Sequence, residues 1–235
     1  MVVVTLFLTS CDYSRYIGID LNDYPDLEDN SQCKMIITNP NEPDFADTIS
    51  WNGKWIKYEM SDTKQEYLAF VDIYKLDNDY DKKLFCSVVA VEDGGVIIKA
   101  YSRDSIFLSG SKSNNLISNF WHGQTMKIKN MSTYNEKDSQ CLHNYHNYLN
   151  KEIDNHNEDL YGAFLYSLDI ALRIMEYNEV DMSYSAFANK MKKEITDGSY
   201  VSKHNIAMPI LDCVITMGDL PLLYYFDFYQ HMLII

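Results

Sequence analysis

The chain has 235 residues, of which 46% are hydrophobic, enough to build the core of one large domain or two small ones. Acidic residues number 34 and lysines plus arginines only 20, so the formal net charge is -14. This balance argues against a nucleic acid or an anionic membrane surface as partner, because both require a basic face. No apolar stretch is long enough to predict a membrane-spanning helix, and five cysteines without a CxxC pair favour free thiols in a reducing compartment.

The first ten residues, MVVVTLFLTS, have two interpretations. Their β-branched residues predict a first strand over residues 2–8. Alternatively, LTSC resembles the lipobox of bacterial lipoproteins, in which the cysteine, here Cys11, carries the lipid. A signal peptide needs a basic start and a longer apolar run, and no Lys or Arg precedes Arg15. The strand is therefore the favoured interpretation.

Short apolar or alternating runs separated by turn residues predict a series of strands in the first half. The predicted strands cover residues 16–21, 33–38, 48–51, 54–60, 67–75, 84–91, 96–101, 105–108 and 125–129. Asn52-Gly53 and Asp93-Gly94-Gly95 are typical of tight hairpin turns, which need residues that accept positive φ. Strands at this spacing without intervening helices predict an antiparallel β-sandwich domain over residues 1–130.

Two features of this half could belong to a site. Trp51 and Trp55 flank the first predicted hairpin, where they form either an exposed recognition patch or, as is commoner, a packed cross-strand pair. An acidic cluster could hold a divalent cation, but it lacks the glycine and the closing glutamate of a calcium loop, so a solvated loop is favoured. The cluster consists of Asp20, Asp23, Asp26, Glu28 and Asp29.

A polar linker over residues 131–139 precedes a predicted α-helical bundle over residues 140–235. Its predicted helices cover residues 140–155, 158–177, 183–196, 204–218 and 220–235. The helix over residues 158–177, capped by Asn157, is apolar around most of its circumference, so it needs other helices on at least two sides. Its predicted solvent-facing stripe consists of Tyr166, Asp169, Arg173 and Glu176.

Polar residues of the second half do not form a recognisable catalytic or metal motif. Cys141, His143, His146 and His156 lack a second pair of ligands at zinc-site spacing. Candidate acid–base groups, His122, His204 and Asp212, are dispersed, without a nucleophile elbow or phosphate loop. The sequence therefore predicts a protein that is not an enzyme and uses no cofactor or metal.

Four segments of the second half resemble, in their order and spacing, the Bcl-2-like intracellular immunomodulators of poxviruses. The segments are QCLHNYHNYL (140–149), LYGAFLYSLD (160–169), FANKMKKEI (187–195) and LDCVITMG (211–218). A β-sandwich in front of such a bundle resembles the two-part type within this family, which antagonises Toll/interleukin-1-receptor adaptors. The resemblance implies an α+β fold with an N-terminal antiparallel β-sandwich and a C-terminal Bcl-2-like bundle that lacks its last helix.

The resemblance also implies a function. The chain would be a virus-encoded protein that blocks innate immune signalling of the Toll-like receptor and NF-κB type in the host cytoplasm. It would bind adaptors or kinase-complex components, or form a homo-oligomer, through a C-terminal apolar face. That face would consist of Leu222, Tyr225, Phe226, Tyr229 and Leu233. Asp219 follows Gly218 where death-regulating relatives carry Arg, which argues against a groove for death peptides. The alternative is a bacterial surface lipoprotein anchored through Cys11, of unknown binding function.

Overall fold

The structure is a computed structural model that describes residues 15–39, 46–60, 66–77, 80–129, 138–156 and 159–177. For residues 124–129, 138–146, 167 and 170–177 it describes the backbone alone. The elements in chain order are β1 (Tyr16–Asp20), β2 (Gln32–Thr38), β3 (Ala46–Asn52), β4 (Trp55–Glu59), β5 (Tyr67–Leu76), β6 (Asp81–Val91), β7 (Val96–Ser102), β8 (Ser105–Gly110), α1 (Lys112–Lys129), α2 (Asp138–Asn155) and α3 (Leu160–Tyr177).

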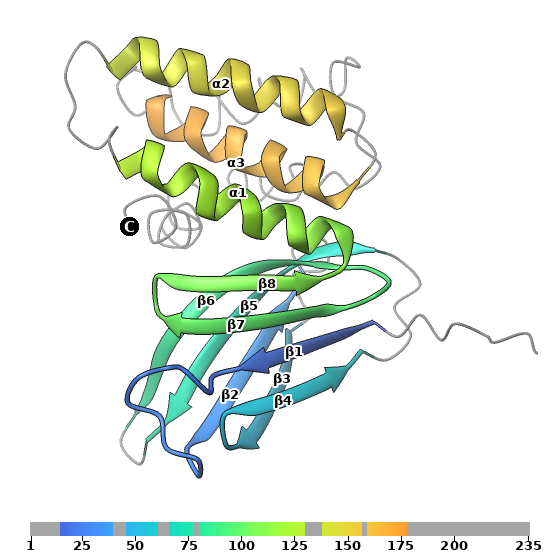
Figure 1. The fold of residues 1–235 in the computed structure, drawn as a ribbon, viewed down its shortest axis with the longest axis vertical. Coiled ribbons are helices and arrows are strands. Elements are labelled where there is room, and N and C mark those ends of the chain that lie inside the picture. The colour runs from blue at the N-terminus through green and yellow to red at the C-terminus, as the bar shows by residue number, and fades with distance from the viewer. Residues whose placement is uncertain are drawn as a thin grey trace, which may run out of the picture.

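The eight strands form two four-stranded sheets, arranged much as in the predicted sandwich (Figure 1). Sheet A has the order β4-β1-β7-β8, and sheet B has the order β3-β2-β5-β6. Side chains alternate between buried and more exposed along β2 and β7, as expected for strands with one face on a core. Ile17, Ile19 and Ile98 of sheet A and Met35 and Ile37 of sheet B are fully buried. The fold is therefore mixed α+β, as predicted.

The prediction of a purely antiparallel arrangement was wrong for one strand pair. β1 and β7 run parallel, with Ile17 beside Val96 and Ile19 beside Ile98. These strands are far apart in the sequence, so no short turn fixes their relative direction. The local pattern of apolar and turn residues predicted both strands, but it carries no information about which strands become neighbours.

Both predicted hairpins were also wrong, because each turn joins strands of different sheets. β3 lies in sheet B and β4 in sheet A, and likewise β6 and β7 are divided between the sheets. Gly53 has a φ of 95°, but its N–H donates to the Ser31 carbonyl (2.9 Å) in the β1–β2 loop. Gly94 and Gly95 have φ values of 92° and 62°. The glycines thus provide the positive φ that the turns require, without a ladder between the flanking strands.

Helix α1 replaces the strand that the sequence predicted over residues 125–129. Leu116, Ile117, Phe120 and Trp121 recur at helical spacing, and Ile117 and Phe120 are buried. The sequence prediction missed this pattern because the helix carries many polar residues. Those polar residues make specific contacts with the sheets.

Helix α1 covers the edge strands of both sheets on one side of the molecule. Asn115 Nδ2 donates to the Gly110 carbonyl (3.0 Å), the Leu108 N–H donates to Ser118 Oγ (3.0 Å), and His122 Nε2 lies 3.1 Å from the Ile106 oxygen. These three side chains share one helix face and bond alternate residues of β8. On β6, the buried Asn114 accepts from the Ala90 N–H (2.9 Å) and donates to its carbonyl (2.8 Å). Side chains of α1 therefore occupy the place of a neighbouring strand on both edges.

The helices form a layer at one end of the sheets, with α1 nearest to them, α3 next and α2 outermost (Figure 1). Helix α3 contacts α1, α2 and β5, which confirms the prediction that other helices surround it. Leu160, Phe164, Leu165 and Leu168 are all buried. The helices also bury one end of sheet B, where Leu68 and Ala69 pair with Ala90 and Val89 and all four are inaccessible.

The predicted solvent-facing stripe of α3 was wrong where the structure tests it. Tyr166 is 3% exposed and Asp169 only 1%, because α1, α2 and β5 together enclose this helix. Arg173 and Glu176 have no described side chains. The cap of α3 is Asp159, whose Oδ1 accepts the Gly162 N–H at 2.9 Å.

The predicted helices over residues 183–196, 204–218 and 220–235 lie outside the described residues, as does Asn157. Among the helices that the structure describes, none combines the length and the apolar character needed to cross a membrane.

Candidate interaction surface

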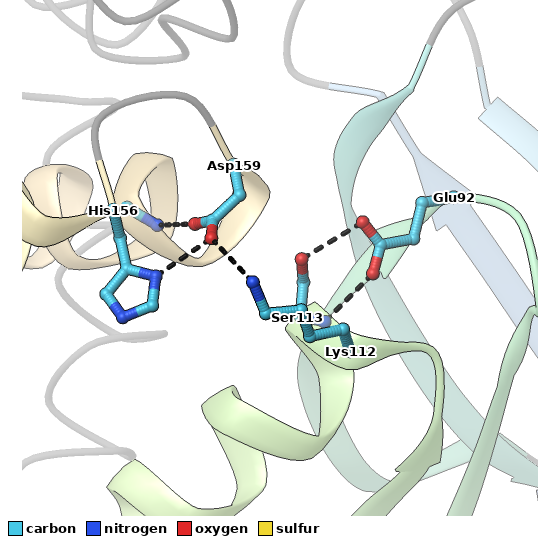
Figure 2. Close-up of polar contacts among 6 residues, drawn as sticks. Glu92, Lys112, Ser113, His156 and Asp159 are labelled. Carbon is cyan, nitrogen blue, oxygen red and sulfur yellow. Dashed lines mark hydrogen bonds and ion pairs between the residues drawn. The ribbon is translucent and has the colours of Figure 1, made fainter.

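A polar junction joins the ends of the three helices to the β6–β7 turn (Figure 2). Asp159 Oδ2 lies 2.8 Å from His156 Nδ1 and 3.8 Å from Lys112 Nζ. Glu92 accepts two bonds from Ser113, one from its N–H (2.9 Å) and one from its hydroxyl (3.0 Å). The junction therefore contains a serine, a histidine and two carboxylates, which are residue types found in hydrolytic sites.

The geometry of the junction fits helix capping and not nucleophilic catalysis. Ser113 Oγ donates to Glu92, so the histidine does not activate it, and the N–H bond to the same carboxylate caps α1. Asp159 caps α3 and holds His156 beside the Tyr161 ring, at a centroid distance of 4.9 Å. Within the part of the chain that the structure describes, His, Cys, Asp and Glu form no group of three or more that could hold a metal ion.

The outer face of sheet A carries a different set of residues. The strand register places Trp55 of β4, Asp20 of β1, Lys99 of β7 and Phe107 of β8 in one row across the sheet. Their neighbours Ile19, Ile98 and Leu108 are buried, so the row faces away from the core. We call Trp55, Asp20, Lys99, Tyr101, Phe107 and His122 the sheet-A surface.

The sheet-A surface carries three of the four exposed large hydrophobic residues of the described part of the chain. Trp55 is 47% exposed, Tyr101 41% and Phe107 42%, and only Tyr80, at 66%, is a comparably exposed large hydrophobic residue elsewhere in the described chain. Large apolar side chains gathered on one exposed face are typical of a binding surface, because water contact with them is unfavourable.

The aromatic side chains at the β8 end hold one another in place. The Phe107 ring stacks on the His122 ring at a centroid distance of 3.8 Å, and Tyr101 meets Phe107 edge-on at 5.6 Å. The bond between His122 and the Ile106 carbonyl ties this group to α1 as well as to the sheet. Such contacts reduce the side-chain freedom that a partner would otherwise have to restrict.

At the β4 end, a glycine lets the Trp55 side chain lie close to the backbone. A Cβ on Gly18 would sit 3.5 Å from Trp55 Cη2 and 3.3 Å from Ile97 Cγ1. The indole therefore rests against β1 and leaves its outer face open to solvent. In the next row, Lys57 Nζ lies 4.3 Å from the centroid of the Tyr16 ring.

Charged groups lie between the two aromatic ends. Lys99 Nζ is 2.8 Å from Asp23 and 4.0 Å from Asp20, and it lies 5.0 Å from the centroid of the Tyr101 ring. The hydrogen bond to Asp23 is the largest of several effects that raise the pKa of Lys99. Lys99 is therefore fully charged at neutral pH.

The structure places only some of the residues that the sequence analysis singled out. Cys11, His204, Asp212 and the proposed C-terminal partner face lie outside the described residues; that face consists of Leu222, Tyr225, Phe226, Tyr229 and Leu233. Trp51 and Trp55 do not form a pair across a hairpin, because Trp51 lies in sheet B and is partly buried, whereas Trp55 is exposed on sheet A. Of the acidic cluster, Asp20 and Asp23 bind Lys99.

Tyr101 and Phe107 were not among the residues predicted to belong to a site. Both alternate with buried residues, Ala100 and Leu108, so their outward direction could be anticipated from the strand pattern. The contact between Phe107 and His122 could not be anticipated, because the residues around His122 were not predicted to form a helix.

Comparison with known proteins gave no match: no family model, curated protein or solved structure is significantly similar to the chain.

Proposed function

We propose that the chain is a non-enzymatic, virus-encoded interaction protein that antagonises host innate immune signalling of the Toll-like receptor and NF-κB type. The observation that carries the proposal is the sheet-A surface, on which Trp55, Tyr101 and Phe107 are each more than 40% exposed. Exposed aromatic anchors that pack on neighbouring side chains are characteristic of protein–protein interfaces.

The order of elements along the chain also supports the proposal. Two four-stranded sheets come first, and helices follow, among them the segment LYGAFLYSLD, which packs between two other helices. This order matches the two-part organisation that the resemblance to poxviral immunomodulators implies. The polar groups at the helix junction are engaged in capping, so the geometry favours binding over catalysis.

The proposed partners are host signalling proteins of the cytoplasm, such as adaptors or components of kinase complexes. A protein that occupies such a partner needs an interface but no chemical step. The net charge of -14 favours a protein partner over a nucleic acid.

Expression of the tagged full-length chain in human cells with an NF-κB reporter tests the proposal. After stimulation of a Toll-like receptor, we expect reporter output to fall several-fold relative to cells that express a tag control. Co-precipitation should then recover a component of the stimulated pathway. Normal reporter output at a high level of the expressed protein would contradict the proposal.

A further inference from the structure

We propose that the sheet-A surface binds a basic segment of the partner, in which arginine or lysine is interspersed with apolar residues. This inference rests on the proposed function, because it specifies the partner chemistry for a surface that is assigned to protein binding. Three observations carry it: the exposed aromatic rings, the cation–ring contacts already present on this face, and the acidic loop beside it.

The exposed rings are suited to cations as well as to apolar groups. An ammonium or guanidinium group over the face of an aromatic ring is attracted by the electron density of the ring, most strongly for tryptophan. Two such contacts are present within the outer face of sheet A, where Lys57 lies over the Tyr16 ring and Lys99 over the Tyr101 ring. An arginine of a partner could make the same contact with the outer face of Trp55, whose side chain is about half exposed.

The loop that follows β1 places negative charge beside this row of residues. From Asp20 to Asp29 the chain has five carboxylates and no basic residue. Three lysines approach the loop: Lys99 contacts Asp20 and Asp23, Lys54 contacts Asp29, and Lys75 donates to the Asp26 carbonyl. The loop stays net negative, and the side chains of Asp23 and Asp29 are 50% and 98% exposed. An acidic segment would be repelled here, and a basic one attracted.

The dimensions of the surface fit a short extended segment. Trp55 and Phe107 lie in the same row but on opposite edge strands of sheet A. Neighbouring strands are about 4.8 Å apart, so the row is about 14 Å wide. An extended chain advances about 3.3 Å per residue, so about five residues cross it. Such a segment could place a basic residue over Trp55 and an apolar one against Phe107 and Tyr101.

Fluorescence anisotropy with the full-length protein tests this proposal. The probe is a labelled peptide of repeated Arg-Leu-Ser triplets, and the control probe has Glu in place of each Arg. We expect the arginine peptide to bind, with affinity that falls as salt is added, and the glutamate peptide not to bind. The double variant Trp55→Ser/Phe107→Ser should weaken binding by about tenfold. The matched control is Tyr80→Ser, which removes an exposed aromatic ring outside the surface and should leave binding unchanged.

Three results would overturn the proposal. They are equal binding of both peptides, no binding of the arginine peptide, or binding by the double variant as tight as that of the unmodified protein. The third result would show that the negative net charge of the protein alone attracts the arginine peptide. If the double variant melts at a lower temperature than the unmodified protein, peptide binding is measured with the two single variants instead, since each removes only one ring.

The reporter assay separates failure of this proposal from failure of the proposed function. If the reporter is inhibited and the arginine peptide does not bind, the partner chemistry is wrong and the proposed function stands. If the peptide binds the sheet-A surface and the reporter is unaffected, the proposed function is wrong and the binding site stands.

Discussion

Two helical glycines differ in how closely the surrounding backbone approaches them. A Cβ on Gly162 would lie 1.8 Å from the His156 carbonyl oxygen, whereas a Cβ on Gly123 would have nothing within 4 Å. Gly162 thus lets the turn before α3 fold back against that helix, beside the Asp159 cap. The glycine is needed there for close approach and not for its φ angle.

We expect opposite effects from alanine at these two positions. Gly162→Ala should lower the free energy of unfolding by about 3 kcal/mol or prevent folding, because backbone atoms must move to relieve the clash. Gly123→Ala should raise it by about 1 kcal/mol, because alanine favours the helix and meets no neighbour. Urea denaturation followed by circular dichroism measures both, and a stable Gly162→Ala variant would contradict the geometry at the junction.

Tyr161 makes stability depend on alkaline pH. Burial is the main cause that raises its pKa above 10.0, and the negative charges of Tyr148, Glu152 and Asp159 add to the effect. Above pH 10 the unfolded state loses the phenol proton while the folded state retains it, so the free energy of unfolding falls as pH rises.

Substitution of Tyr161 by phenylalanine should reduce this alkaline loss of stability. We expect Tyr161→Phe to lose less thermal stability than the unmodified protein between about pH 9 and pH 11. The exposed Tyr80 is the control, and Tyr80→Phe should leave the pH dependence unchanged. Identical profiles for Tyr161→Phe and the unmodified protein would contradict the assigned burial.

Individual polar residues were the least predictable part of the sequence. Helical periodicity alone placed Asp169 on a solvent-facing stripe, but the residue is buried, because burial depends on how many elements surround the helix. Asn157 and Asp159 are both residue types that cap helices, and only the backbone geometry identifies Asp159 as the one that bonds Gly162.

At the scale of elements, α1 contributes to the sheets as a strand would. We expect Asn114→Ala to lower the free energy of unfolding by about 2–4 kcal/mol, because it leaves the N–H and the carbonyl of Ala90 buried without their partner. Asn115→Ala is the matched control, since Asn115 is exposed, and it should cost less than about 1 kcal/mol. Thermal unfolding measures both, and an effect of Asn114→Ala as small as that of the control would show that the buried bonds to Ala90 contribute little.

The sequence predicted individual strands and helices better than it predicted the pairing of the strands. Eight strands and helices α2 and α3 were anticipated with small errors at their ends, because alternation and helical periodicity are local signals. The pairing of strands is not local. Asn52-Gly53 and Gly94-Gly95 supply turn geometry that is equally compatible with a hairpin and with a crossing between sheets. Helix α1 was missed because its polar residues, which bond the strand edges, dilute its apolar pattern.

At the scale of the whole molecule, an aromatic cluster joins the sheets to the helices. Phe120 of α1 lies 5.8 Å from Phe164 and 6.4 Å from Tyr161 of α3, measured between ring centroids, and α1 also covers β6 and β8. The sequence could not anticipate this contact, because it depends on a helix that the predicted boundary near residue 130 assigned to the β-domain.

Loss of the Phe120 ring should therefore destabilise the sheets and the helices together. We expect Phe120→Ala to lower the free energy of unfolding by about 3–5 kcal/mol. The midpoint of unfolding measured by tryptophan fluorescence and the midpoint measured by far-ultraviolet circular dichroism should shift by the same amount. Phe107→Ala is the control, because this ring is 42% exposed, and it should lower the free energy of unfolding by no more than about 1.5 kcal/mol. Two separate transitions in the Phe120→Ala protein would show that the two parts unfold independently.

The sheet-A surface is the feature of the whole molecule on which the proposed function depends. Its role can be measured in the NF-κB reporter assay by comparing Trp55→Ser/Phe107→Ser with Tyr80→Ser at matched expression. We expect the double variant to lose most of the inhibition and Tyr80→Ser to retain it. Inhibition by the double variant as strong as that of the unmodified protein would contradict the assignment of this surface.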